Sequence, residues 1–392
     1  MNWKKVLVIA FALVLTLGLV ACNGESAEQE VEQDAQNVET TVDDAVTGED
    51  ALRVVVVTSP SGVDDGSFNQ NNYEGVLAFI EAGGNATVND IREPEMDNAV
   101  AAVEQIVANY DVVVLPGFQF AGITPVAEAN PETYFILVDT FPVDDAGEEV
   151  TLDNVYAMRF AEQESGFLAG IAAALTTESG KVAFVGGGAI PPVVNYQFGF
   201  EAGVNFANAN LDASAELVNL SAFAGTDVRD INVGGNYVGT FNDEATGKQI
   251  GDALIAEGAD VIFVAAGGSG NGVFTAAKEA EGVYVIGCDV DQFDDGADGD
   301  RNVVLTSALK VMDLQVQKQL DAVAAGTFVG GNSVLTAADD ATGIVTADGR
   351  QQLSAETISA LEDALSAMNA GTIVPPGNFS DDSVDDFPGL SQ

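Results

Sequence analysis

The chain has 392 residues, of which 47% are hydrophobic, and its 61 acidic and 13 basic side chains give a formal net charge of −48 with no histidine. A surface this negative repels phosphate backbones and anionic headgroups, which excludes nucleic acid as a partner and leaves solubility, in a habitat whose salt screens the charge, as the simplest role of the acid. The absence of histidine excludes Ser-His triads, Cys-His dyads and histidine metal ligands. Length and hydrophobic content suffice for two lobes with separate cores.

The chain begins with the pattern of a secretory signal. Lys4 and Lys5 precede an apolar run over residues 6–20, and small residues lead to a cysteine in "LVAC", which ends at Cys22. This ending resembles a bacterial lipobox, and the resemblance implies cleavage before Cys22 and lipidation of its thiol. The lipid would anchor the protein to the cell membrane, facing the periplasm or the cell exterior, without a spanning helix. An ordinary signal with a chance cysteine is the alternative.

Residues 23–52 predict an acidic, disordered tether. The segment is rich in Glu, Asp, Gln, Ser and Thr and contains no Lys or Arg, so it repels itself and lacks the apolar surface needed to order. Beyond this tether only Cys288 remains as a second cysteine, and a single thiol forms no internal disulfide. We therefore expect the folded part to depend on its hydrophobic cores alone.

The folded part is expected to begin at Arg53 and to alternate strands with helices. "RVVVVTS" has the β-branched run of a strand buried on both faces, and the apolar residues between Tyr73 and Ile80 recur at helical spacing. Further strand-like runs follow at residues 112–118, 134–140, 181–188, 260–268 and 284–289, with helical patterns around "ESGFLAGIAAAL" and "FGFEAGVNFANA". Two sets of such units predict an α/β fold with two lobes, each a parallel sheet flanked by helices.

Polar and glycine residues follow the strands at the positions where open parallel sheets bind ligands. "TSPSGVDDGSFN", "DTFP", "GGGAIPP", "AAGGSGNG" and "CDVDQFDD" each come after a predicted strand. Ligands of such sheets bind outside the carboxyl ends of the strands. If both lobes turn these edges toward each other, their loops line one cleft.

Several of these segments together resemble one family. "DDGSFNQNNYEGV", "GFLAG", "VAFVGGGAIPPVVNYQFGFEAGV", "YVGTFNDEATGKQIGDALIAEGADVIFVAAGGSGNGVFTAAKE", "VYVIGCDVDQ", "LTSALK" and "AMNAGTIVPP" occur in the order and spacing of the basic membrane protein (BMP), or purine nucleoside receptor, lipoproteins. These are the substrate-binding components of ABC importers, and the resemblance covers residues 53–376.

The resemblance implies a two-lobed periplasmic-binding-protein-like fold of type I with hinge crossovers. The binding domain would span residues 53–392, with lobes at roughly 53–176 and 177–287 and the remainder crossing between them. The expected ligand is a purine nucleoside (guanosine, inosine or adenosine), delivered to a membrane permease that a separate ATPase drives.

The resemblance also implies roles for individual residues. Phe68 and Phe241 match the two aromatic residues that sandwich a base, each ring contributing about 1–3 kcal/mol by stacking. Asn69 and Asp139 match positions that address the base edge, where an ionised Asp accepts N–H donors such as those of guanine or hypoxanthine and an Asn serves either role. Without the resemblance, each Phe could plug a loop, and Asn69 and Asp139 could cap turns or helices.

A second group matches the family's ribose contacts. Asp289 and Lys310 correspond to the carboxylate and the cation that hold the diol, although Lys310 could instead form an internal salt bridge. Gly267 and Gly268 would let the backbone approach the ligand, or simply form a tight turn. The chain departs from the family pattern at Gly66, Tyr196 and Cys288, which stand where a basic residue, a phenylalanine and a valine are usual. Tyr196 could thus add a hydroxyl to the pocket.

Two other classes of function fit the sequence poorly. "GGSGNG" (residues 267–272) lacks the spacing of a dinucleotide fingerprint because Val273 replaces the last glycine, and no P-loop or nucleophile is evident. "DGDRNV" starts like a calcium loop at Asp298, but Val303 and Leu309 replace the required Gly and Glu. We therefore predict no catalytic residue, cofactor or metal. A binding protein of the same fold that takes a sugar or another small solute remains open.

Overall fold

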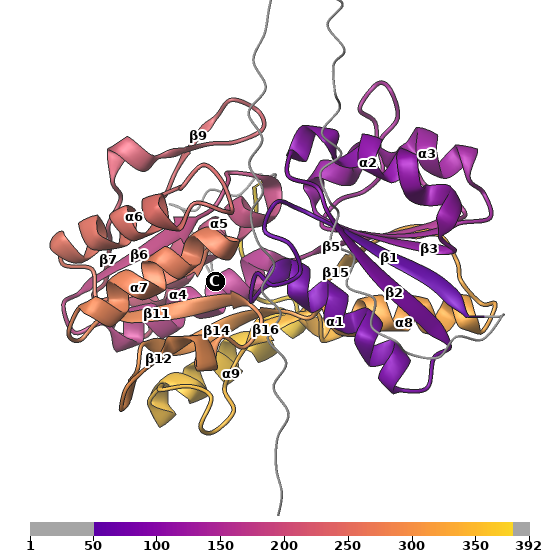
Figure 1. Ribbon diagram of the computed structural model, residues 1–392. Coiled ribbons are helices and arrows are strands. Elements are labelled where there is room, and N and C mark those ends of the chain that lie inside the picture. The colour runs from indigo at the N-terminus through magenta and orange to yellow at the C-terminus, as the bar shows by residue number, and fades with distance from the viewer. Residues whose placement is uncertain (1–50, 379–392) are drawn as a thin grey trace, which may run out of the picture. The chain divides into compact units, whose positions relative to one another are not determined.

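The computed structural model describes residues 51–378. The predicted signal peptide, Cys22 and nearly all of the predicted tether lie outside the described residues. The described part contains two six-stranded sheets, each covered by helices on both faces (Figure 1). An α/β fold with parallel sheets is therefore confirmed.

The first sheet has the strand order β15-β5-β4-β3-β1-β2, and all its neighbouring strands run parallel. Its strands are β1 (Leu52–Thr58), β2 (Ala86–Arg92), β3 (Val112–Pro116), β4 (Tyr134–Val138), β5 (Val155–Phe160) and β15 (Gly331–Leu335). Helices α1 (Phe68–Glu81) and α8 (Met312–Ala324) cover one face, and α2 (Ala99–Ile106) and α3 (Thr124–Ala129) cover the other (Figure 1). In β1, Val54 to Val57 are all buried, as expected for a strand with helices on both sides.

The second sheet has the order β16-β14-β11-β10-β6-β7, and only its edge strand β16 runs antiparallel to its neighbour. Its strands are β6 (Lys181–Gly186), β7 (Glu216–Leu217), β10 (Val261–Ala265), β11 (Tyr284–Asp289), β14 (Val304–Lys310) and β16 (Thr342–Ile344). Helices α4 (Glu162–Thr176), α5 (Pro191–Asn210) and α9 (Ala355–Asn369) pack in one core, and α6 (Glu244–Ala256) and α7 (Gly270–Glu279) in the other. Two short hairpins, β8 (Gly225–Thr226) with β9 (Asn232–Gly234) and β12 (Ala297–Asp298) with β13 (Arg301–Asn302), complete the strands.

The chain crosses between the lobes three times, at places that differ from the expected division. It passes from β5 to α4, from β14 to α8, and from β15 to β16. Residues 162–176 were expected in the first lobe, but α4 packs with α5 on the second sheet. β14 also belongs to the second sheet, whereas α8 and β15 return to the first.

The first turn of α4 lies at one crossover and forms hydrogen bonds with the other two. The Ser165 hydroxyl donates to the Leu309 carbonyl at 2.7 Å and accepts from the Gly343 amide at 2.9 Å. The Glu164 carboxylate accepts from the Thr342 hydroxyl and the Ala337 amide, both at 2.7 Å. The hinge is therefore a single hydrogen-bonded unit built around one helix end.

Glycines allow α4 and α5 to pack with their backbones in contact. A Cβ added at Gly170 would overlap the carbonyl oxygen of Phe200, and one added at Gly203 would overlap that of Phe167. The "GFLAG" segment thus contributes its glycines to a helix interface where a larger residue has no room.

We expect Gly170→Ala to lower the free energy of unfolding by about 1–3 kcal/mol, because the added methyl group forces the two helices apart. Urea denaturation of the wild type and the variant measures this loss. Gly331→Ala is the matched control, since a Cβ at Gly331 meets nothing within 4 Å. Equal losses in both variants would contradict the close packing of α4 against α5.

Candidate ligand-binding site

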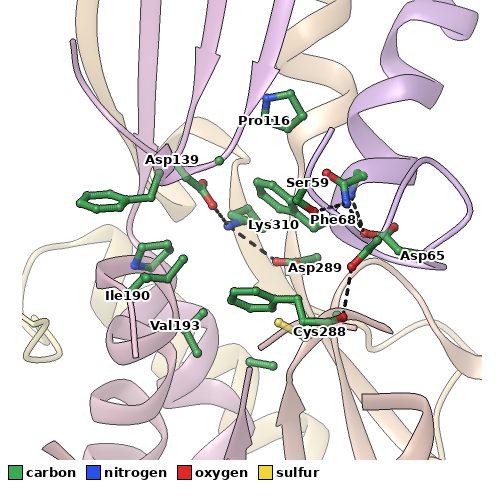
Figure 2. Close-up of a pocket in the computed structure, with 18 of the residues that line it drawn as sticks. Ser59, Asp65, Phe68, Pro116, Asp139, Ile190, Val193, Cys288, Asp289 and Lys310 are labelled. Atoms are coloured by element: carbon green, nitrogen blue, oxygen red, sulfur yellow. Dashed lines mark hydrogen bonds and ion pairs between the residues drawn. The ribbon is translucent and has the colours of Figure 1, made fainter. Parts of the chain in front are cut away.

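A cavity lies between the two sheets at the loops that follow their strands (Figure 2). About 610 Å³ of space lies between its walls, part of it open to solvent. Its lining residues include Ser59, Ser61, Asp65, Phe68, Asn69, Met96, Phe118, Gln119, Asp139, Ile190, Val193, Tyr196, Phe241, Gly267, Cys288, Asp289 and Lys310. The carboxyl ends of parallel strands thus form the cavity, as the sequence analysis expected.

The structure brings nearly all the predicted site residues to this cavity. Gly268 is the exception, because it does not line the cavity and its added Cβ would lie 3.1 Å from the Phe241 carbonyl oxygen. Gly268 therefore leaves room for the backbone at Phe241, while the neighbouring Gly267 is at the cavity wall with φ +51°.

The two predicted aromatic residues reach the cavity from different lobes. Phe68 is the first residue of α1 and packs with one face of the first sheet. Phe241 packs against the core of the second lobe, and its ring lies so close to Gly187 that a Cβ there would overlap it. Both rings are only partly buried. Each therefore keeps some of its surface available to a ligand.

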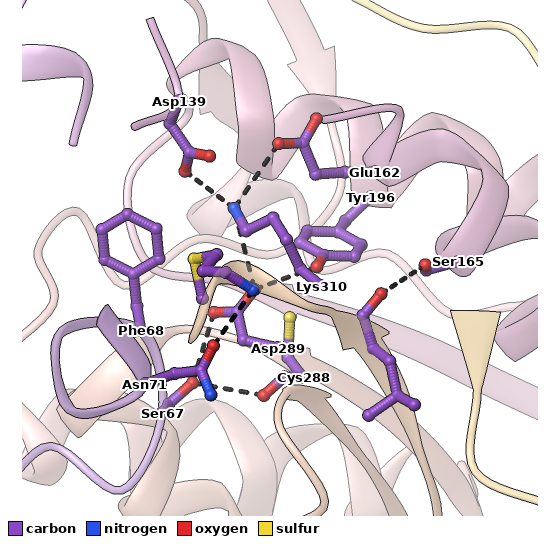
Figure 3. A network of polar contacts seen from close by, with 12 residues as sticks. Ser67, Phe68, Asn71, Asp139, Glu162, Ser165, Tyr196, Cys288, Asp289 and Lys310 are labelled. Atoms are coloured by element: carbon purple, nitrogen blue, oxygen red, sulfur yellow. Dashed lines mark hydrogen bonds and ion pairs between the residues drawn. The ribbon is translucent and has the colours of Figure 1, made fainter. Parts of the chain in front are cut away.

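Lys310 is buried at the end of β14 with three carboxylates around its ammonium group (Figure 3). Its Nζ lies 2.7 Å from Asp139 Oδ2, 3.4 Å from Glu162 Oε1 and 3.7 Å from Asp289 Oδ1. Burial alone would lower the pKa of Lys310, but the charges of these three carboxylates raise it. This group, here called the Lys310 cluster, joins both lobes and the hinge.

Glu162 is the member of the Lys310 cluster that sequence analysis missed. It is the first residue of α4 and is only 2% exposed, and its Oε2 accepts from Asn195 Nδ2 at 2.9 Å. Burial raises the pKa of Glu162 to about 8, against the opposing charge of Lys310. The partners of Glu162 are far apart in the chain, and the strand before it, β5, was not predicted, so no local pattern marked this residue.

Asp139 and Asp289 occupy equivalent positions in the two lobes. Each lies at the carboxyl end of a strand, β4 and β11, and each has φ 69°, in the left-handed region that Asp tolerates better than most residues. Burial raises the pKa of Asp139, and its Oδ1 is buried without a hydrogen-bond partner in the protein. Strained backbone of this kind is typical of functional positions.

Tyr196 lines the cavity, but its hydroxyl is already engaged. Its Oη donates to Asp289 Oδ1 at 2.9 Å, and Ser67 Oγ donates to Asp289 Oδ2 at 3.3 Å (Figure 3). Burial raises the pKa of Tyr196 well above its ordinary value, so it stays a donor at neutral pH. Tyr196 therefore orients Asp289 in the free protein.

The two lobes also contact each other directly beside the cavity. Ser61 Oγ donates to the Phe241 carbonyl at 3.1 Å, and the single hydrogen of Ser67 Oγ is shared between Asp289 and the Cys288 carbonyl, which lies at 3.2 Å. The lobes are thus closed on each other in this structure. Both serines come from the "TSPSGVDDGSFN" segment, which was expected at the cleft, although neither was predicted to link the lobes.

The rival calcium loop is part of a hairpin. Asp298 forms an ion pair with Arg301 at 3.0 Å across the turn between β12 and β13. Among residues 51–378, no group of three or more acidic or cysteine side chains is arranged to hold a metal ion. Over the same residues, no helix is both long and apolar enough to cross a membrane.

Two α/β lobes joined by three crossovers, with a cavity between them, define a fold of the periplasmic-binding-protein type. The folds of solved structures agree. An ABC transporter solute-binding protein from Aeropyrum pernix superposes with a TM-score of 0.70 at 23% identity, over 85% of this chain and 95% of that one. A solute-binding protein from Conexibacter woesei gives 0.62 at 23% identity, over 84% and 100%.

Sequence comparison identifies the family. Residues 52–220 and 227–377 match the Bmp family, described as ABC transporter substrate-binding protein PnrA-like, and the chain belongs to this family. It is 30% identical to the CD4+ T-cell-stimulating antigen of Listeria innocua, over 95% of this chain and 99% of that protein. It is 32% identical to the ABC transporter nucleoside-binding protein BmpA of Lactococcus lactis, over 72% and 78%. The resemblance seen in the sequence is confirmed.

Family membership establishes the general role. The protein is an extracytoplasmic, membrane-associated substrate-binding component of an ABC transporter, which binds a small solute and interacts with a permease. The family is one of binding proteins and not of enzymes.

Proposed function

We propose that this protein captures purine nucleosides in the cavity between its lobes and delivers them to a permease powered by a separate ATPase. The main support is the combination of two partly exposed aromatic rings, Phe68 and Phe241, with the buried Lys310 cluster in one cavity. A nucleoside has a flat base and a ribose diol, which match these two kinds of surface. The relative from Lactococcus lactis, named a nucleoside-binding protein, adds support.

In this proposal each part of the ligand has its own contacts. Phe68 and Phe241 stack on the base, and Asn69 and Asp139 bind its edge. Asp289 accepts hydrogen bonds from the ribose hydroxyls while Lys310 donates to them. The lobes open at the hinge to admit the ligand and close on it, as in other two-lobed binding proteins. A lipid on Cys22 would keep the protein at the membrane beside its permease.

The charge of the cavity favours nucleosides over nucleotides. Among residues 51–378, Lys310 is the only Lys or Arg that lines the cavity, and its ammonium group already faces three carboxylates. A phosphate group would meet net negative charge in a site of low dielectric constant, where repulsion between like charges is strong. We therefore expect nucleoside monophosphates to bind much more weakly than the corresponding nucleosides.

We expect Phe68→Ala to weaken purine nucleoside binding by about 1–3 kcal/mol, roughly 5- to 150-fold, because one stacking surface is lost. Equilibrium titration measures the affinity, and thermal unfolding checks that the fold persists. Phe328→Ala is the control, because Phe328 packs against Tyr134 outside the cavity and should change stability without changing affinity. Unchanged affinity in Phe68→Ala would remove this residue from the site.

A further inference from the structure

Asp65 organises the first turn of α1 beside the cavity (Figure 2). Its carboxylate accepts hydrogen bonds from the backbone amides of Ser67 at 3.1 Å, Asn69 at 3.0 Å and Gln70 at 3.1 Å. It also accepts from the side-chain amide of Asn69, with Nδ2 at 2.8 Å from Oδ2. Burial raises the pKa of Asp65, but these four donors oppose the rise by favouring the ionised form.

The side-chain amide of Asn69 is held in one orientation. Its Nδ2 donates both hydrogens within the protein, to Asp65 Oδ2 at 2.8 Å and to Ser59 Oγ at 2.9 Å. An ionised carboxylate only accepts hydrogen bonds, so turning the amide over would place Asn69 Oδ1 against Asp65 Oδ2, oxygen to oxygen. Asn69 Oδ1 is buried and has no hydrogen-bond partner in the protein, although the residue lines the cavity.

A second polar group of the cavity also lacks a hydrogen-bond donor. Asp139 Oδ1 is a second buried acceptor without a partner. Lys310 donates to Asp139 Oδ2 and Glu162 Oε1, and Tyr196 donates to Asp289, so neither residue bonds to the two unpaired oxygens. A ligand that leaves buried acceptors unpaired loses affinity, because their lost hydration is not replaced. The ligand must therefore supply hydrogen-bond donors.

We propose that Asp65 sets the ligand specificity of the site by holding Asn69 as a hydrogen-bond acceptor, so that the cavity selects purines with N–H groups on the base edge. This inference rests on the proposed binding of nucleosides. Guanine and hypoxanthine carry a hydrogen on N1, and guanine adds an amino group beside it, whereas adenine has a lone pair at N1. The site thus prefers guanosine and inosine to adenosine. Asp65 is a positioning residue, since it acts through Asn69.

The test compares the guanosine-to-adenosine affinity ratio of the wild type with that of Asp65→Asn at neutral pH. Asparagine keeps one oxygen that can accept from the backbone amides of Ser67 and Gln70, and its NH₂ group, in place of Asp65 Oδ2, can donate to Asn69 Oδ1 and let that amide turn over. The backbone amide of Asn69 loses its acceptor, so thermal unfolding checks that the variant folds. We expect guanosine to bind at least about 10-fold more tightly than adenosine in the wild type. This factor corresponds to the binding free energy that about one additional hydrogen bond contributes. In Asp65→Asn this ratio should fall severalfold. If Asp65 had only a structural role, its replacement would weaken the binding of guanosine and of adenosine by the same factor.

Ser59→Ala is the matched control. It removes the other acceptor for Asn69 Nδ2 but leaves the carboxylate of Asp65 in place. Its affinity ratio should therefore stay close to that of the wild type. Comparing inosine with adenosine in the wild type tests the same preference without any variant, should Asp65→Asn fail to fold.

The outcomes separate this inference from the proposed function. Tight nucleoside binding with equal affinities for inosine, guanosine and adenosine would overturn the selectivity and leave the nucleoside role intact. An unchanged ratio in a folded Asp65→Asn protein would overturn the role of Asp65. Failure of every nucleoside to bind the wild type would overturn the proposed function and this inference together.

Discussion

Lys310→Met is expected to lower the free energy of unfolding by about 3–5 kcal/mol, because it leaves two buried carboxylates and the partly buried Asp289 without their cation. Lys310 is 2% exposed, and its partners Asp139 and Glu162 are almost equally buried. A methionine has a similar length and fills the space of the lysine stem. The loss of stability is therefore due to the missing charge and not to a cavity. The same variant should lose most of its affinity for nucleosides.

This destabilisation should grow as pH rises. Without Lys310 the folded protein can relieve its charge by binding protons at Asp139 and Glu162, whose pKa values burial already raises above those of the unfolded chain. The folded variant then binds more protons than the unfolded one, so its stability falls with increasing pH. Urea denaturation at pH 5 and pH 8 measures the change, and the gap between variant and wild type should be larger at pH 8.

Lys248→Met is the control for a surface lysine. Lys248 also has two acidic partners, Asp252 at 3.0 Å and Glu279 at 2.8 Å, but all three side chains are substantially exposed. Its removal should lower the free energy of unfolding far less than the loss of Lys310, because solvent screens an exposed ion pair. A loss at Lys310 no greater than that at Lys248 would contradict the view that Lys310 neutralises a buried acidic cluster.

The second large effect is expected at Asp289. Asp289→Ala should weaken nucleoside binding by about 3–6 kcal/mol if its carboxylate accepts both ribose hydroxyls, at about 1.5–3 kcal/mol for each hydrogen bond to a charged group. Free bases lack the ribose, so guanine or hypoxanthine should bind the variant almost as well as the wild type. Titration of nucleoside and base with each protein measures the difference.

Tyr196→Phe helps to interpret this result. Tyr196 donates to Asp289, so its loss removes a contact that orients the carboxylate but leaves the carboxylate itself. We expect a smaller loss of nucleoside affinity than in Asp289→Ala. Equal losses of nucleoside and base in Asp289→Ala would contradict the ribose role.

The fold could be predicted because its signals are local. Most strands at the centre of the two sheets are short β-branched or aromatic runs, such as Val54 to Val57 in β1, and several are followed by polar or glycine residues at the same edge of the sheet. The strands β2, β5 and β15 of the first sheet lack this clear pattern and were not predicted. This regularity also placed Phe68, Asp139 and Asp289 at one cavity, since all three follow predicted strands. The matching of several family motifs then assigned a role to each.

Other features depended on contacts between distant segments. Helix α4 is apolar on most of its surface, so its pattern does not tell which sheet it covers, and the lobe boundary was wrong for that reason. Its glycines, spaced four residues apart at Gly166 and Gly170 and matched by Gly199 and Gly203, were the available sign of its packing on α5. Asp65 had no distinguishing signal, because it was one of many acidic residues in the chain.

The most direct test of the account is calorimetric titration of the protein after unfolding and refolding to remove any ligand that copurifies. Guanosine, inosine, adenosine, cytidine, ribose and galactose would be titrated in turn. The account predicts tight binding of purine nucleosides, with guanosine and inosine ahead of adenosine, and no heat from either sugar. Binding of a sugar with silence from every nucleoside would contradict it, and would mean that this fold and its aromatic cavity serve a different solute.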